Sequence, residues 1–304
     1  MRASSEPFVE STRSEPAPVP TGVGRMALGV SGRRFDLPHI GLYGIEAGNG
    51  PLVVCLHGIT ANAYVWLPVM EHLARTFRVL AIDQRGHGRS DKPKGPLYAA
   101  ADYARDAAAL IQHVDAGRAI LLGHSLGARN ALALAASIPD WIAAVLAVDF
   151  TPFIEADAFN ALEARVSGGD RDFATTEAVE EYLSDRYRRL PADAIRRRAL
   201  YGFGRGATGR LAPLADAQAM AETCGGLRAD LSVTLGALRV PTLLVRGEDS
   251  TFVSRAAFAR TRRLRPDLAA VEIAGADHYV PEEQPLAVAQ ALIDFVRTSA
   301  LSET

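Results

Sequence analysis

One serine of the chain stands in a setting typical of a catalytic nucleophile. Residues 123–127 read Gly-His-Ser-Leu-Gly, a Gly-x-Ser-x-Gly motif centred on Ser125. An apolar run precedes the motif at residues 119–122, and an Ala- and Leu-rich stretch follows it to residue 137. This order of strand, sharp turn and helix is that of a nucleophile elbow, which lifts the serine hydroxyl above the edge of a sheet. We therefore predict that Ser125 attacks an acyl carbon.

A serine nucleophile needs a general base, and seven histidines compete for this role. His278 lies in a loop, residues 275–279, between the last strand-like run and the last helix-like run. Its place late in the chain matches the order Ser, acid, His that follows such an elbow. His124 directly flanks the nucleophile and cannot fold back onto its hydroxyl, and His57 is expected to have a structural role after a strand. We predict His278 as the base.

The acid that orients this base has two candidates. Asp149 directly follows the apolar run 143–148, and Asp249 lies in the loop 247–250. The common arrangement places the acid three residues after the glycine of the later loop, where this chain has Ser250. Asp149 should end its strand at the sheet edge that also carries Ser125. We prefer Asp149, and Asp249 would then cap a turn or the following helix.

Acyl transfer also needs two donors for the oxygen that becomes negatively charged in the transition state. One expected donor is the backbone N–H of Leu126, the residue after the nucleophile. The other is expected in the loop after the first central strand, residues 57–60, where the N–H of Ile59 is the candidate. The reaction requires no metal and no organic cofactor.

The elements that must position these residues alternate along the chain. Strands are predicted at 26–30, 42–46, 52–56, 78–82, 119–122, 143–148, 241–246 and 269–273. Helices are predicted at 65–74, 99–113, 126–137, 255–265 and 285–298. Continuous apolar strands that alternate with helices are typical of a mostly parallel sheet covered on both faces. We predict an α/β fold with such a sheet of eight strands.

The predicted strands stop between residues 152 and 227, a segment with a helical pattern and many arginines. It follows one core strand and precedes the next, as an inserted helical cap over the carboxyl ends of the strands would. The expected domains are a disordered tail at 1–22, a core at 23–151 and 228–304, and a cap at 152–227. Most of the cap arginines, such as Arg171, Arg188, Arg189, Arg196, Arg197 and Arg198, should be solvated surface residues.

Composition excludes several classes of protein. The formal net charge of −2 gives no basic surface, so nucleic acid is not an expected partner. No apolar run approaches the roughly 18 residues of a membrane span, and the Ser-, Glu- and Pro-rich start lacks the apolar core of a signal peptide. The two cysteines, Cys55 and Cys224, are expected to be reduced. We expect a cytoplasmic protein without a membrane partner, and leave a homodimer open.

Several segments resemble one family of hydrolases. The core motifs at 57–60 and 123–130 and the segments 148–155, 162–166, 191–196 and 275–279 are similar to the (E)-2-(acetamidomethylene)succinate hydrolases of bacterial vitamin B6 degradation, which have the α/β-hydrolase fold. The resemblance implies an orienting acid at Asp149 and substrate-binding roles for Arg165, Arg186 and Tyr187. It also implies an amidohydrolase that releases acetate, with succinic semialdehyde, ammonia and carbon dioxide, from a small dicarboxylate.

The implied arginines suit such a substrate. A planar guanidinium can pair with a carboxylate through two hydrogen bonds, so one arginine for each carboxylate is a natural arrangement. Two other functions remain open: a carboxylesterase or lactonase of broad specificity with the same triad, and a ligand-binding receptor on this fold. A haloalkane dehalogenase would carry an aspartate nucleophile where this chain has Ser125.

Overall fold

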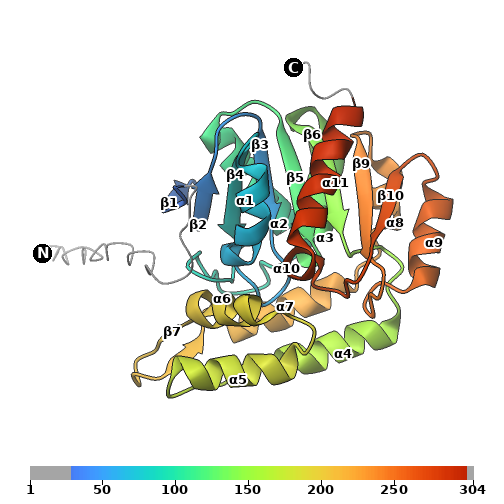
Figure 1. The fold of residues 1–304 in the computed structure, drawn as a ribbon. Coiled ribbons are helices and arrows are strands. Elements are labelled where there is room, and N and C mark those ends of the chain that lie inside the picture. Colours follow the sequence, from blue (N-terminus) through green and yellow to red (C-terminus); the bar gives the residue numbers. More distant parts are fainter. Residues whose placement is uncertain (1–28, 300–304) are drawn as a thin grey trace, which may run out of the picture.

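An eight-stranded sheet forms the centre of the computed structural model, which describes residues 29–299 (Figure 1). Strands β1 and β2 are antiparallel to each other, β2 is antiparallel to β4, and the remaining neighbours are parallel. The predicted mostly parallel sheet of eight strands is therefore confirmed. In spatial order the strands are β1 (Ser31–Leu37), β2 (Ile40–Ala47), β4 (Arg78–Asp83), β3 (Leu52–Leu56), β5 (Ala119–His124), β6 (Ile142–Val148), β9 (Thr242–Gly247) and β10 (Ala269–Ile273).

The first strand lies further along the chain than predicted. The predicted strand at 26–30 falls mostly outside the described residues, as does the predicted tail at 1–22, and residues 29–30 precede β1 without strand structure. Within β1 only Phe35 and Leu37 are buried. A strand with two buried side chains gives a weak apolar signal, which explains why the sequence pattern missed it.

Helices cover both faces of the sheet (Figure 1). On one face α1 (Leu67–Leu73) packs against α11 (Pro285–Thr298), and on the other α3 (Leu126–Ser137) packs against α2 (Ala100–Val114) and α8 (Ser232–Ala237). Each face of the sheet has its own apolar core because its central strands are buried on both sides. The remaining elements of this part are the 3₁₀ helices η1 (Ala63–Trp66) and η2 (Pro139–Trp141) and the helices α9 (Arg255–Leu264) and α10 (Val280–Glu283).

The segment predicted as a cap lies across the ends of the strands, below the sheet in Figure 1. Its helices pack in pairs, α4 against α7 and α5 against α6, and α6 also contacts η1 of the core. The prediction that strands stop here is wrong in one detail, because residues 203–213 form a small antiparallel hairpin. The elements are α4 (Ala156–Ser167), α5 (Thr176–Arg186), α6 (Ala192–Gly202), β7 (Phe203–Arg205), β8 (Leu211–Pro213) and α7 (Ala217–Leu227).

Candidate active site

Ser125 occupies a sharp turn between β5 and α3. Its φ of +52° and ψ of −114° lie in a region that non-glycine residues rarely adopt. The turn is held because Ser125 N–H donates a hydrogen bond to the carbonyl oxygen of Val148, 2.9 Å away, on the neighbouring strand. A Cβ atom on Gly127 would lie 2.0 Å from the carbonyl oxygen of Leu56, so no larger residue fits at that position. These are the local features of a nucleophile elbow.

His278 and Asp149 meet beside this turn. His278 Nδ1 lies 2.8 Å from Asp149 Oδ2, and both side chains are buried. Asp149 Oδ2 also accepts a hydrogen bond from Ser250 Oγ at 2.6 Å, and Oδ1 accepts one from Gly247 N–H at 3.0 Å. Three donors thus fix the carboxylate, which in turn fixes the orientation of the imidazole ring.

Asp249, the alternative acid, lies elsewhere. Its carboxylate forms an exposed ion pair with Arg189 at 2.8 Å, and its backbone N–H bonds to the carbonyl of Ala276. Ser250 stands where the common arrangement would place the acid, and its hydroxyl donates to Asp149 instead. The sequence showed that Ser250 was unusual at this position, but a hydroxyl alone does not reveal which carboxylate it contacts.

The environment of His278 disfavours a charged imidazole. Burial, together with the cations of Arg165 and Arg198, lowers the pKa of His278 to about 3. Burial also raises the pKa of Asp149, while the hydrogen bonds from Ser250 and Gly247 oppose that shift. A neutral imidazole whose Nδ1–H points at a carboxylate leaves Nε2 free to accept a proton.

No hydrogen bond joins the Ser125 hydroxyl to His278 within residues 29–299. The two residues are nevertheless held together, because His124 Nε2 donates to the backbone carbonyl of His278 at 2.6 Å. Hydrogen bonds of a catalytic serine are often long or poorly aligned before substrate binds, and the hydroxyl can rotate.

The two predicted oxyanion donors lie on segments that flank Ser125. Leu126 is the first residue of α3, where backbone N–H groups have no partner within the helix. On the other side, a Cβ atom placed on Gly58 would lie 3.4 Å from Ser125 Cβ, so the loop that carries Ile59 passes close to the serine. His57 fixes this loop: Nδ1 donates to the Gly58 carbonyl at 2.7 Å and Nε2 accepts from the backbone of Gln84 at 3.0 Å.

Two arginines of the cap segment lie side by side and lack a carboxylate partner among residues 29–299. Arg165 donates to the hydroxyl of Tyr279, next to His278, and Arg186 donates to the backbone carbonyl of Arg165. Arg186 also contacts the Tyr187 hydroxyl at 3.4 Å. Neither guanidinium forms an ion pair with any described carboxylate. The structure therefore brings together all three residues that the resemblance implied for substrate binding.

A third arginine at this site was not expected from the sequence. Arg198 is buried, and its Nε lies 3.0 and 3.1 Å from the two carboxylate oxygens of Glu282. Its guanidinium carbon lies 4.7 Å from the ring centre of Tyr187 and 5.0 Å from that of Tyr279. The expectation that Arg198 is a solvated surface residue is wrong, as it is for Arg197, which is also buried.

This concentration of cations changes the acidity of Tyr187. Burial opposes ionisation of the phenol, but the cations of Arg198, Arg165 and Arg186 outweigh it and lower the pKa of Tyr187 to about 8. The local field therefore favours negative charge, whether on a side chain or on a bound molecule.

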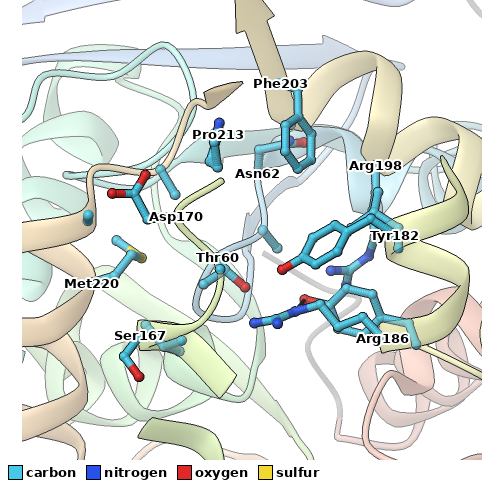
Figure 2. A pocket seen from close by; sticks show the side chains of 18 of the residues that line it. Thr60, Asn62, Ser167, Asp170, Tyr182, Arg186, Arg198, Phe203, Pro213 and Met220 are labelled. Carbon is cyan, nitrogen blue, oxygen red and sulfur yellow. Dashed lines mark hydrogen bonds between the residues drawn. The ribbon is translucent and has the colours of Figure 1, made fainter. Parts of the chain in front are cut away.

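Two cavities meet at Arg186 and Tyr187. The first, which we call the arginine cavity, has a volume of about 480 Å³ and is lined by His278 and Arg165. The second, which we call the Thr60 cavity, has a volume of about 180 Å³ and lies between the loop 60–62 and the helices α4 to α7. Figure 2 shows Thr60, Met220, Phe203 and Arg186 around the Thr60 cavity.

The described residues contain neither a cluster of metal-ligating side chains nor a membrane-spanning helix. No group of three or more His, Cys, Asp or Glu side chains in residues 29–299 is arranged to hold a metal ion. Over the same range no helix is long and apolar enough to cross a membrane.

Comparisons with known proteins agree with this geometry. Residues 51–285 match the family described as the alpha/beta hydrolase fold. A 2-(acetamidomethylene)succinate hydrolase of Mesorhizobium japonicum is 50% identical over 264 residues, which are 87% of this chain and 94% of that protein. The crystal structure of an E-2-(acetamidomethylene)succinate hydrolase superimposes with a TM-score of 0.86 at 50% identity, covering 88% of this chain and 99% of the other. An esterase of Mycobacterium tuberculosis is 29% identical over 256 residues, 82% of this chain and 83% of its own.

Proposed function

Because the chain belongs to the α/β-hydrolase family, we propose that it hydrolyses the amide bond of a small dicarboxylate enamide, (E)-2-(acetamidomethylene)succinate, and releases acetate. The half-identical relatives that carry this substrate in their names support the proposal over most of the chain's length. In this proposal Ser125 is the nucleophile, His278 the general base and Asp149 the residue that orients the base.

One observation carries the choice of a dicarboxylate. Arg165 and Arg186 line the cavity beside His278, and neither pairs with a carboxylate among residues 29–299. A partly buried cation without a counter-charge is costly, and two of them side by side repel each other. A ligand with two carboxylates supplies both missing partners, and the guanidinium fork suits each of them. Tyr187, held between the arginines, would complete the contact surface.

The proposed reaction begins when Ser125 Oγ attacks the acetyl carbonyl carbon and His278 Nε2 takes the hydroxyl proton. The carbonyl oxygen becomes an oxyanion, which the N–H groups of Ile59 and Leu126 stabilise. His278 then returns the proton to the departing nitrogen, the C–N bond breaks, and the acetyl group remains on Ser125 as an ester. Asp149 keeps Nδ1 protonated throughout, so that Nε2 is the atom that exchanges protons.

Deacylation repeats these steps with water. His278 takes a proton from the water molecule, hydroxide attacks the acetyl ester, and acetate leaves as Ser125 regains its proton. The enamine that left in the first half would break down to succinic semialdehyde, ammonia and carbon dioxide. Every step uses groups of this chain, the substrate and water.

The test compares two substrates in Arg165→Ala and Arg186→Ala. Removing one partner of a buried charge pair costs about 2–5 kcal/mol, so kcat/KM for the dicarboxylate enamide should fall by roughly 30-fold or more. Hydrolysis of p-nitrophenyl acetate, which has no carboxylate, should change little. Arg→Lys should restore little activity, because an ammonium group cannot form the same paired hydrogen bonds. Equal losses on both substrates would contradict the dicarboxylate assignment and favour a broad-specificity esterase.

A further inference from the structure

The Thr60 cavity is not needed for an acetyl group, and we propose that it binds the alkyl part of longer acyl groups, so that the enzyme also hydrolyses amides and esters of linear acids from about four to six carbons. This inference rests on the proposed function for the positions of the oxyanion and the leaving group. It extends that function to a second class of substrate, medium-length N-acyl and O-acyl compounds.

The first step of the argument is the geometry of the reacting carbon. In the tetrahedral intermediate this carbon carries Ser125 Oγ, the oxyanion, the departing nitrogen and the acyl substituent. The departing nitrogen must face His278, because that residue protonates it. The oxyanion faces the N–H groups of Ile59 and Leu126. The acyl substituent is left to point away from His278, along the loop that continues from Ile59 to Thr60.

The second step is that the two cavities lie on these two sides. His278 lines the arginine cavity but not the Thr60 cavity, whereas Thr60, Ala61 and Asn62 line the Thr60 cavity but not the arginine cavity. We therefore assign the leaving group to the arginine cavity, and the acyl substituent to the Thr60 cavity, which the residues directly after Ile59 line.

The charges of the two cavities support the same division. The arginine cavity is lined by Arg165, Arg186, Arg188 and Arg189 against Asp185 and Asp277; since Arg189 already pairs with Asp249, a surplus of one cation remains. The Thr60 cavity is lined by Arg186 and Arg198 against Glu163 and Asp170; Arg198 already pairs with Glu282 and Glu163 with Arg228, so no surplus of cations remains. A carboxylate is therefore attracted to the first cavity and gains nothing in the second.

The third step is the size and lining of the Thr60 cavity. Met220, Ala221 and Cys224 of α7 line one side of it, and Phe203 and Leu183 contribute further apolar surface. Figure 2 shows Met220 and Phe203 among these residues. Its volume of about 180 Å³ is far more than a methyl group fills. In another protein an apolar cavity of roughly 150 Å³ holds a benzene molecule, with six carbons. A chain of up to about four methylene groups beyond acetyl should therefore fit.

The experiment measures kcat/KM for two matched series. One series carries acetyl, butanoyl and hexanoyl groups on the dicarboxylate enamide, and the other carries them on p-nitrophenol. Burial of each methylene should raise kcat/KM about fourfold, so the butanoyl compound, with two more methylenes, should exceed the acetyl compound by about fifteenfold in both series. A steady fall of kcat/KM with chain length in both series would overturn the inference, and hydrolysis of the acetyl enamide would leave the proposed function intact.

A variant pair tests the location. Ala221 is exposed on α7 and lines the cavity, so Ala221→Phe should fill the space and lower the ratio of hexanoyl to acetyl kcat/KM at least tenfold. Gln218→Phe places the same side chain on the same helix outside the cavity and should leave the ratio unchanged. An unchanged ratio in Ala221→Phe would show that long chains bind elsewhere and would overturn the inference. If the esters show the expected pattern but no enamide is hydrolysed, the cavity assignment stands and the proposed substrate is wrong.

Discussion

Replacing Asp149 by asparagine tests the assignment of the orienting acid most directly. The two carboxylate oxygens of Asp149 have different partners: Oδ1 accepts from Gly247 N–H, and Oδ2 accepts from the Ser250 hydroxyl and from His278 Nδ1. The backbone N–H of Gly247 can only donate, so the amide oxygen of an asparagine must take the place of Oδ1. The amide NH₂ group then faces His278.

This orientation predicts the size of the effect. The NH₂ group can only donate to Nδ1, so the imidazole must carry its proton on Nε2, where it cannot accept the proton of Ser125. In serine proteases the same change of tautomer lowers kcat about 10⁴-fold. That factor corresponds to about 5.4 kcal/mol in the activation free energy. We expect a loss of this order in Asp149→Asn.

Asp249→Asn is the matched control. The Asp249 carboxylate is 47% exposed and pairs with Arg189, which is 46% exposed, and exposed ion pairs contribute about 0–1 kcal/mol. Its activity should stay within about twofold of the unmodified enzyme. The assay is kcat/KM with p-nitrophenyl acetate, with Ser125→Ala as the background and thermal unfolding as a check of folding. A folded Asp149→Asn that keeps a tenth of the activity, or a large loss in Asp249→Asn, would refute this reasoning.

Two further predictions concern charge. Arg165→Gln should move the acid limb of the pH profile to higher pH, because removal of a cation raises the pKa of His278 from its lowered value of about 3. Activity is lost as the pH falls through that pKa. The pH profile of kcat/KM for p-nitrophenyl acetate measures this shift, and an unchanged acid limb would contradict the prediction. Glu282→Gln should lower the free energy of unfolding by about 3–5 kcal/mol, since it leaves Arg198 buried without its counter-charge; urea unfolding measures this loss, and a loss below about 1 kcal/mol would mean that solvent reaches Arg198.

The core of the site could be predicted because the sheet imposes its geometry. The carboxyl ends of parallel strands converge at one edge, so residues that directly follow β5 and β6 must lie close together. Ser125 follows the apolar part of β5, and Asp149 follows β6. The choice of Asp149 over Asp249 depended only on where each residue lies relative to the end of a strand. The end of an apolar run in the sequence marks that point.

The sequence could not show which cap arginines are buried and which are exposed. Arg196, Arg197 and Arg198 are consecutive, yet the first is exposed and the other two are buried. The buried guanidinium of Arg198 pairs with the carboxylate of Glu282, which lies 84 residues further along the chain. No local sequence pattern predicts a pairing between a cap helix and α10. The hairpin of β7 and β8 was not predicted, because strands of three residues are too short to show an alternation of apolar and polar side chains.

The electrostatics of the site connect substrate binding with the strength of the base. In the free enzyme burial and the cations of Arg165 and Arg198 disfavour protonation of His278, which makes it a weak base. On the proposed substrate, the carboxylate beside Arg165 would offset one of these cations, and an anion near an imidazole raises its pKa. The dicarboxylate would therefore strengthen the base that activates Ser125, whereas a neutral ester would not. Binding energy from groups remote from the reacting bond would in this way stabilise the transition state. Such stabilisation raises kcat, whereas equal stabilisation of the bound substrate would raise only the affinity.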